Sequence, residues 1–224
     1  MRTDTGYAPA VDIIDAAGGN TGSVYRALER LGVPYSCSSK SGPPDGSRPV
    51  ILPGVGSFGA VMSRLRQADL DRRLTSLIGS GVPFLGICVG LQVLFDESEE
   101  SPGVAGLGLL PGRVRRFTEG KVPQIGWNRI ESARPECQDD YPDGYVYFVN
   151  SFFAEPDKSF EKEIVLYRGQ YYRSFCAAVL KDNITAFQFH PEKSGRFGMS
   201  LLACWLGSCG IEVRESRAVL EAVS

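Results

Sequence analysis

The sequence has little or none of several features that mark particular classes of protein. Its 224 residues include one histidine, His190, which excludes a histidine-rich metal site. No stretch approaches the ~18 apolar residues of a membrane-spanning helix, and residues 1–10 hold no apolar core of signal-peptide length. Lys+Arg 24 against Asp+Glu 26 leaves no basic field for nucleic acid or an anionic membrane. We therefore expect a cytoplasmic protein that needs no metal or other cofactor.

The cysteines lack the spacing of a metal ribbon, because no C-x-x-C pair occurs. Six are spread along the chain: Cys37, Cys88, Cys137, Cys176, Cys204 and Cys209. In a cytoplasmic chain of this length such scattered cysteines indicate reduced thiols and not a disulfide framework.

Apolar segments and helical patterns alternate in the first half of the chain. We expect strands at 11–14, 35–38, 50–52 and 83–87, and helices at 23–31, 58–80 (in two pieces) and 90–95. Ser23 is the expected cap of the first helix, which follows a turn at 18–20. This alternation predicts βαβ units and a parallel sheet covered by helices on both faces.

The second half is richer in aromatic and β-branched residues, and few helices separate its strands. Strands are expected at 112–117, 145–153, 164–167, 175–180 and 184–189, and a last helix at 198–206. Strands joined without helices are typical of antiparallel pairing. The prediction is therefore one α/β domain over residues 1–224, with its core at about 11–207: a mostly parallel doubly wound sheet with additional antiparallel strands.

The densest chemical signal is Gly86-Ile87-Cys88-Val89-Gly90, where an expected strand meets an expected helix. G-x-C-x-G is the cysteine form of the nucleophile elbow, in which a sharp turn needs small residues two positions before and after the nucleophile. A helix N-terminus also favours the thiolate. The alternative is that Cys88 is an inert buried cysteine among glycines.

A nucleophilic cysteine needs a base, and His190 is the only imidazole in the chain. We expect Pro191 to stop the strand before it and to keep the chain extended. His190 and Glu192 would then project to the same side, so that the carboxylate orients the imidazole. The order Cys88, His190, Glu192 predicts a catalytic triad, against the alternative of a structural or merely exposed histidine.

A second glycine turn, Pro53-Gly54-Val55-Gly56, follows another buried strand. Parallel strands open on one crevice at their carboxyl ends, so this turn is expected to face the elbow. The backbone N–H groups of Val55 and Val89 could then hold an oxyanion, although an ordinary strand-to-helix turn also fits. No G-x-G-x-x-G or G-x-x-x-x-G-K-[ST] phosphate-binding pattern is present.

Six segments together resemble the class I glutamine amidotransferases. They are LPGVGSFG (52–59), FLGICVGLQ (84–92), GLGLLPG (106–112), KVPQIGWN (121–128), YFVNS (147–151) and QFHPEKSG (188–195). The Gly-Trp-Asn and Glu-Lys-Ser-Gly segments are similar to those of one branch, the glutaminase subunits of imidazole glycerol phosphate synthase. That resemblance extends over about residues 13–206.

The resemblance implies a function and further site residues. Cys88 would attack glutamine to give a thioester, His190 would transfer protons, and Gln92, Gly56 and Ser151 would hold the substrate. The ammonia would pass through a channel to a (β/α)8 cyclase subunit in a heterodimer. That cyclase makes imidazole glycerol phosphate and an aminoimidazole carboxamide ribonucleotide in histidine biosynthesis.

The sequence departs from this branch at Asn150 and Gln124, where histidine is common, and at Ala16-Ala17, where an aromatic residue and glycine are common. These departures leave room for a second interpretation, in which the same chemistry serves a paralogous synthase for sugar amidation in surface polysaccharide. A third is a non-catalytic binding partner of the same fold, or a related cysteine hydrolase. The complete set of Cys88, His190 and Glu192 argues against a non-catalytic protein.

Overall fold

Five parallel strands form the first half of a continuous sheet in the computed structural model, which describes residues 8–16 and 21–213. They lie in the order β2-β1-β3-β4-β12, with bounds β2 (Tyr35–Cys37), β1 (Val11–Ile13), β3 (Val50–Gly54), β4 (Phe84–Cys88) and β12 (Ile184–Phe187). Every residue of β3, β4 and β12 is buried. Helices on both faces of a parallel sheet account for such continuous burial.

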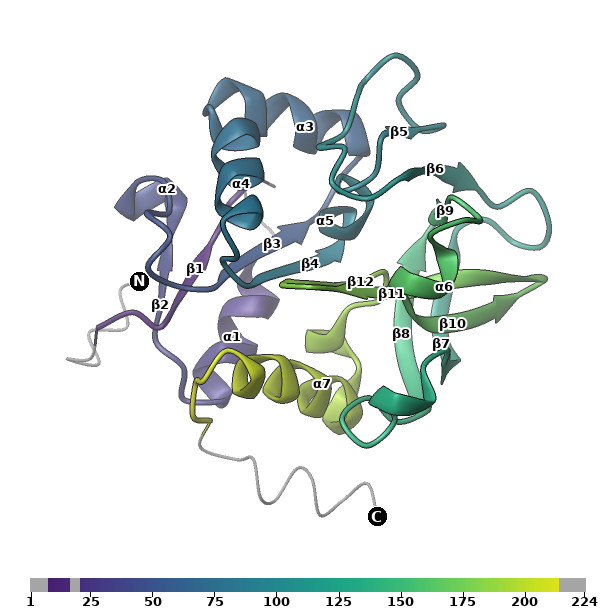
Figure 1. The fold of residues 1–224 in the computed structure, drawn as a ribbon. Helices are drawn as coiled ribbons and strands as arrows, with labels where there is room; N and C mark the ends of the chain where they lie inside the picture. The colour runs from purple at the N-terminus through teal and green to yellow at the C-terminus, as the bar shows by residue number, and fades with distance from the viewer. Residues whose placement is uncertain (1–7, 17–20, 214–224) are drawn as a thin grey trace.

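The long helices cover the two faces of these parallel strands (Figure 1). On one face lie α3 (Phe58–Gln67) and α4 (Leu70–Gly79), and on the other α1 (Gly22–Arg30) and α7 (Gly195–Ser208). The remaining helical pieces are short: α2 (Ser38–Ser41), α5 (Val89–Gln92), α6 (Glu161–Ile164), η1 (Pro135–Cys137) and η2 (Pro191–Lys193). Among the residues described, no helix is long and apolar enough to span a membrane.

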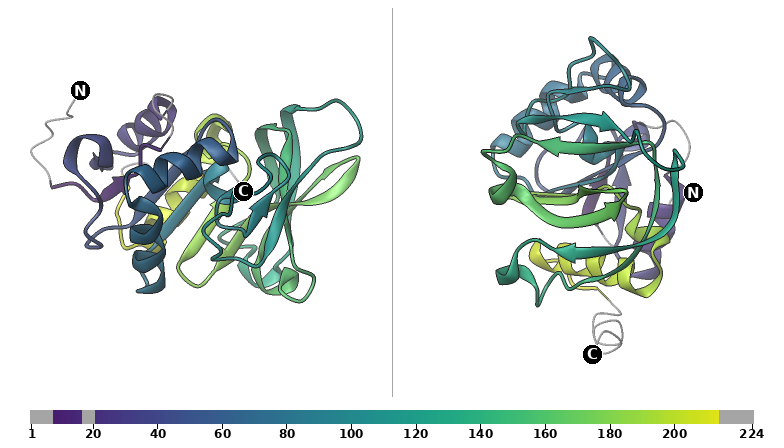
Figure 2. Two further views of the ribbon diagram at one scale, coloured as in Figure 1. Left: turned by 90° about the horizontal axis from the view of Figure 1, so that it is seen from above. Right: turned by 90° about the vertical axis from the view of Figure 1, so that its right-hand side faces the viewer.

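The sheet continues from β12 into mainly antiparallel strands, which gather at the end away from β1 and β2 (Figure 2). The path runs through β11 (Arg173–Lys181), β10 (Val165–Tyr171), β7 (Gln124–Ser132) and β8 (Gly144–Asn150). Three further strands lie off this path: β5 (Glu97–Ser98), β6 (Gly112–Arg116) and β9 (Phe152–Pro156). The expected division into a parallel half and a more antiparallel half is confirmed.

Several local expectations were wrong. Ser23 does not cap α1, because Thr21 is the N-cap residue, and Ser23 lies inside the first turn. The strand expected at 145–153 is two strands, broken at Ser151, and the strand β7 was not predicted. Two helices at 58–80 are confirmed, but the helix after Cys88 has only four residues. Ala17 and the turn expected at 18–20 lie outside the described residues.

Three glycines allow β3, β4 and α5 to pack at backbone distance. A Cβ atom on Gly54 would lie 2.2 Å from the Gly90 nitrogen, and one on Gly86 would lie 2.6 Å from the Gly90 oxygen. A Cβ on Gly90 would lie 2.0 Å from the Leu52 oxygen. Backbone atoms cannot move aside as a flexible side chain can, so the small residues expected around Cys88 are required by packing.

We predict that Gly90→Ala lowers the free energy of unfolding by about 3 kcal/mol, because the added methyl group forces the strand and the turn apart. The matched control is Gly79→Ala at the end of α4, where a Cβ meets nothing within 4 Å. Urea unfolding of both variants measures the difference. Equal stability of the two would contradict the close approach at Gly90.

Candidate active site

Cys88 is the last residue of β4 and lies at the centre of the site. Its backbone has φ 56° and ψ −109°, a left-handed conformation that a residue with a side chain rarely adopts. β4 pairs in parallel with β3 on one side and β12 on the other. The carboxyl ends of all three strands therefore open on the same edge of the sheet. The strained turn directs the thiol to this edge.

His190 follows β12 and is held by backbone and hydroxyl contacts. Its N–H donates to the Tyr147 carbonyl at 3.1 Å, and its own carbonyl accepts from the Ser194 hydroxyl at 2.6 Å. Ser194 Oγ in turn accepts from the Tyr147 N–H at 2.9 Å. The residues around the imidazole are thus bonded to β8, the last strand of the sheet.

Glu192 lies against the imidazole, as expected, but the chain does not reach it in an extended conformation. Residues Pro191–Lys193 form the 3-10 helix η2, and this tight turn brings Glu192 Oε1 to 2.9 Å from His190 Nδ1. Ser23 in α1 donates a second hydrogen bond to the same oxygen, at 3.2 Å. The expected contact between Glu192 and His190 therefore forms, but a 3-10 turn and not an extended chain brings the two side chains together.

The buried imidazole is the most perturbed titratable group of the site. Burial by itself lowers the pKa of His190, but hydrogen bonds to Cys88 and Glu192 outweigh it and raise the pKa to about 10. Burial raises the pKa of Glu192, yet the hydrogen bond and charge of His190 hold it below its ordinary range. The ring is therefore protonated at neutral pH, between a sulfur atom and a carboxylate.

This arrangement changes the expected source of positive charge at Cys88. A four-residue α5 aligns few peptide dipoles, so a helix N-terminus contributes little here. His190, whose pKa is raised by Cys88 and Glu192, provides a full positive charge instead. The positive charge beside the sulfur therefore comes from His190 and not from the helix.

Gln92 is buried, 3% exposed, and is the last residue of α5. Its Nε2 donates to the Phe152 carbonyl at 3.2 Å and to Gln188 Oε1 at 3.0 Å. The Nε2 atom of Gln188 in turn lies 3.7 Å from the Cys88 sulfur. Gln188 is not among the predicted site residues, although it lies two residues before His190 at the end of the strand expected at 184–189.

The other predicted site residues lie around this edge of the sheet with fewer contacts. Val55 shares a small crevice with His190 and Glu192, and Val89 directly follows Cys88 in the chain. Gly56 is exposed and has φ +102°, which favours glycine, and Ser151 lies between β8 and β9. Their roles in holding the oxyanion or the substrate stay predictions.

Two of the positions at which the sequence differs from the branch it resembles lie opposite each other on neighbouring strands. Gln124 of β7 pairs in register with Asn150 of β8, and both side chains are buried. Asn150 Nδ2 donates to the Phe152 carbonyl at 2.9 Å, the same oxygen that accepts from Gln92. The Gln124 carboxamide and Asn150 Oδ1 have no hydrogen-bond partner among the described residues. At the third departure, the Ala16 carbonyl accepts from Arg64 at 3.1 Å.

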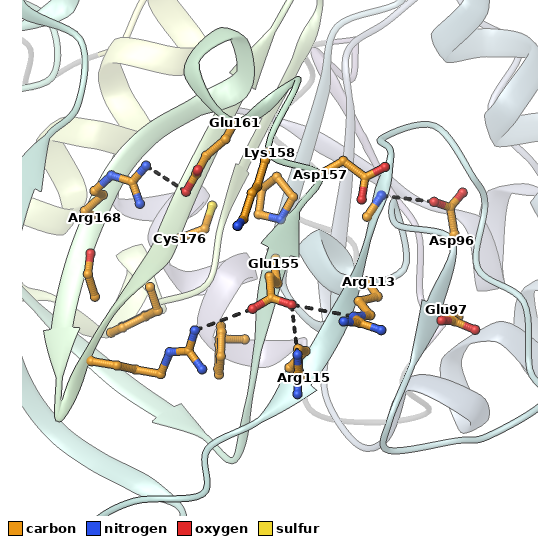
Figure 3. Close-up of a pocket in the computed structure, with 17 residues that line it drawn as sticks. Asp96, Glu97, Arg113, Arg115, Glu155, Asp157, Lys158, Glu161, Arg168 and Cys176 are labelled. Carbon is orange, nitrogen blue, oxygen red and sulfur yellow. Dashed lines mark hydrogen bonds and ion pairs between the residues drawn. The ribbon is translucent and has the colours of Figure 1, made fainter.

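A large cavity of about 740 Å³ lies elsewhere, among β6, β9, β10 and β11 (Figure 3). Arg113, Arg115 and Arg173 converge there on Glu155 at 3.3–3.5 Å. Its wall carries five acidic and five basic side chains, so it has no net charge. None of the predicted site residues lines it. Over the described part of the chain, no group of His, Cys, Asp and Glu could hold a metal ion, and all six cysteines are free.

Residues 12–205 match the family model described as glutamine amidotransferase class-I. The chain therefore belongs to the class I glutamine amidotransferase family. Two solved structures share its fold: a glutamine amidotransferase (TM-score 0.69, 20% identity, 90% of this chain and 100% of that one) and PurLQS from Thermotoga maritima (0.70, 19%, 90% and 99%).

Curated relatives define the branch more narrowly. The chain is 45% identical over 205 residues to the imidazole glycerol phosphate synthase subunit HisH of Geobacillus thermodenitrificans, covering 88% of this chain and 95% of the relative. It is 43% identical over 194 residues to the HisH subunit of Methanothermobacter thermautotrophicus, covering 86% and 95%. Within the class, the chain is a member of the HisH family.

Because the chain has one histidine, the ionisation of His190 can be read directly by NMR in untagged protein. We predict that the ring stays protonated up to about pH 10. Since the pKa is raised on folding, the stability it contributes is complete below its ordinary range near pH 6.5 and is lost as the pH rises through about 10.

Glu192→Gln should lower the midpoint of this titration by about one to three pH units, because the opposite charge is removed. Ser23→Ala is the control, since it deletes a hydrogen bond to Glu192 but no charge. A wild-type midpoint near 6.5 would contradict the charged pair.

Proposed function

We propose that this chain is a glutaminase subunit that hydrolyses L-glutamine to glutamate and ammonia through a thioester on Cys88. The observation that supports it best is the contact of a strained, buried cysteine with an imidazole that a carboxylate holds at 2.9 Å. A thiolate paired with an imidazolium is a prepared nucleophile with a proton donor beside it. These are the two groups that cleavage of a carboxamide needs.

The proposed reaction has two steps. The Cys88 thiolate adds to the carboxamide carbon, and the N–H groups of Val55 and Val89 stabilise the oxyanion. His190 then gives its proton to the nitrogen, and ammonia leaves a γ-glutamyl thioester. Neutral His190 next takes a proton from water, which attacks the thioester, and glutamate leaves as the Cys88 thiolate and the His190 imidazolium are restored. Glu192 keeps the ring oriented in both steps, and Gln92, Gly56 and Ser151 hold the glutamine.

We further propose that the ammonia passes to a (β/α)8 cyclase subunit in a heterodimer. That subunit uses it to make imidazole glycerol phosphate and an aminoimidazole carboxamide ribonucleotide in histidine biosynthesis. The names of the relatives, subunits of imidazole glycerol phosphate synthase, support this destination. The relatives do not favour the alternative of sugar amidation.

An exposed apolar surface supports a partner. Ile125, Trp127, Tyr145 and Val149 lie on one face of the paired strands β7 and β8, and are 61%, 57%, 60% and 38% exposed. Clustered apolar side chains of this size mark interaction surfaces. Trp127 packs edge-on against Tyr147, whose backbone is bonded to His190 and Ser194. A subunit bound to this β7–β8 face would lie next to the triad.

A glutamine-like electrophile, 6-diazo-5-oxonorleucine, should label the wild-type chain at Cys88, and Cys88→Ala should remove that label. Five other cysteines remain as internal controls, so the modified peptide is identified by mass spectrometry. With a histidine-pathway cyclase and its ribonucleotide present, glutamate release should rise strongly. Labelling of Cys88→Ala at the wild-type rate would remove the nucleophile from the proposal, and no glutamate release from the complex would refute the function.

Trp127→Ala should weaken binding of the cyclase subunit at least tenfold, because a central exposed tryptophan is a typical binding hot spot. Titration calorimetry of the two subunits measures the change. Phe160→Ala is the control, since Phe160 is also exposed but precedes α6, away from this face. Equal losses for the two variants would rule out the β7–β8 face as the docking surface.

A further inference from the structure

Gln188 is a completely buried polar residue that contacts the reacting sulfur, yet the catalytic steps above do not use it. It is 0% exposed and lies between the end of β12 and His190. Its backbone N–H donates to the Ala177 carbonyl at 2.9 Å, which fixes the residue against β11. On either side Phe187 and Phe189 stack with their ring centroids 4.9 Å apart. Complete burial and contacts to Gln92 and Cys88 hold the side chain in place.

The direction of each hydrogen bond follows from one carbonyl group. The Phe152 oxygen can only accept, so the group of Gln92 facing it is the Nε2 amide. The second hydrogen of this nitrogen is donated to Gln188. The accepting atom must therefore be the carboxamide oxygen of Gln188, Oε1, which lies 3.0 Å from Gln92 Nε2. The other end of the Gln188 carboxamide, Nε2, is then the group that faces the Cys88 sulfur at 3.7 Å.

A carboxamide N–H can donate to sulfur but cannot accept from it. It therefore interacts more favourably with the thiolate than with the neutral thiol. The imidazolium of His190 contacts the same sulfur. The thiolate thus has two donors of different kinds: one that carries a charge and can transfer a proton, and one that is neutral and keeps its hydrogens.

We propose that Gln188 is a further catalytic-site residue, which stabilises the Cys88 thiolate and orients Gln92. This inference rests on the proposed function, because it assigns Gln188 to the same nucleophile. Gln92 uses both hydrogens of its amide on protein acceptors, so only its oxygen is left to meet a substrate. Gln92 would then accept a hydrogen bond from an N–H group of glutamine.

The test follows the alkylation of Cys88 by iodoacetamide against pH, with peptides separated by mass spectrometry. Gln188→Met keeps the length of the side chain but cannot donate, and Gln188→Glu places a carboxylate beside the sulfur. We expect the midpoint of alkylation to move up about one pH unit in Gln188→Met, a tenfold change in the acid dissociation constant, and further in Gln188→Glu. His190 and Glu192, the titratable groups on this side of the sulfur, are present in every variant.

Thr185→Val is the matched control, because Thr185 is a buried polar residue of β12 in the same segment. It should leave the midpoint unchanged. In the complex with the cyclase, Gln188→Met should also raise KM for glutamine, because Gln92 loses its acceptor. Midpoints within about 0.3 pH units of wild type in both Gln188 variants would overturn the inference.

A second measurement uses the wild-type chain and does not depend on whether the variants fold. The side-chain N–H resonances of Gln188 should shift as Cys88 ionises, and this shift should be absent in Cys88→Ala. Resonances that do not follow the ionisation of Cys88 would refute the contact. Wild-type Cys88 that fails to react with 6-diazo-5-oxonorleucine would instead refute the proposed function, so the two failures can be told apart.

Discussion

The close approach of three backbone segments is the constraint on which the rest of this site depends. Gly90 lies against Leu52, and Gly54 and Gly86 lie against the turn that holds Gly90, at distances where no Cβ fits. In the turn from Gly86 to Gly90, Cys88 is the residue that carries a reactive side chain. The turn holds its backbone in the left-handed region, with φ 56°. Because neighbouring parallel strands end at the same edge, the turn also fixes which other residues the sulfur can meet.

The second constraint is electrostatic. An imidazole as buried as His190 would by itself lose its proton, yet two partners reverse this tendency. Each partner comes from a different part of the fold: Cys88 from β4, and Glu192 from η2, which is supported by Ser23 of α1. The charge on one ring thus depends on a strand, a turn and a helix being packed together.

The parallel half and the placement of Cys88, His190 and Glu192 near one another were predictable, because long apolar runs, glycine spacing and a lone histidine are strong local signals. The strand β7 was missed, since Gly126, Asn128 and Arg129 interrupt any apolar pattern and its Trp127 faces solvent. The break at Ser151 and the turn at Glu192 depend on contacts distant in the chain. Gln188 was not predicted because it is one polar residue within an aromatic segment. Its partners, Gln92 and Cys88, are distant in the sequence, so no local pattern indicates the contacts.

Because β4 lies between β3 and β12, its position also determines which parts of the site separate first when the protein opens. Strands bonded on both sides open only when much of the domain opens, whereas short turns at the end of a sheet open locally. Cys88 is therefore attached to the most persistent part of the fold, whereas His190 and Glu192 lie in and before the short turn η2, which follows β12. Partial opening would separate His190 and Glu192 from a sulfur that has not moved, leaving a folded but inactive form that closing restores.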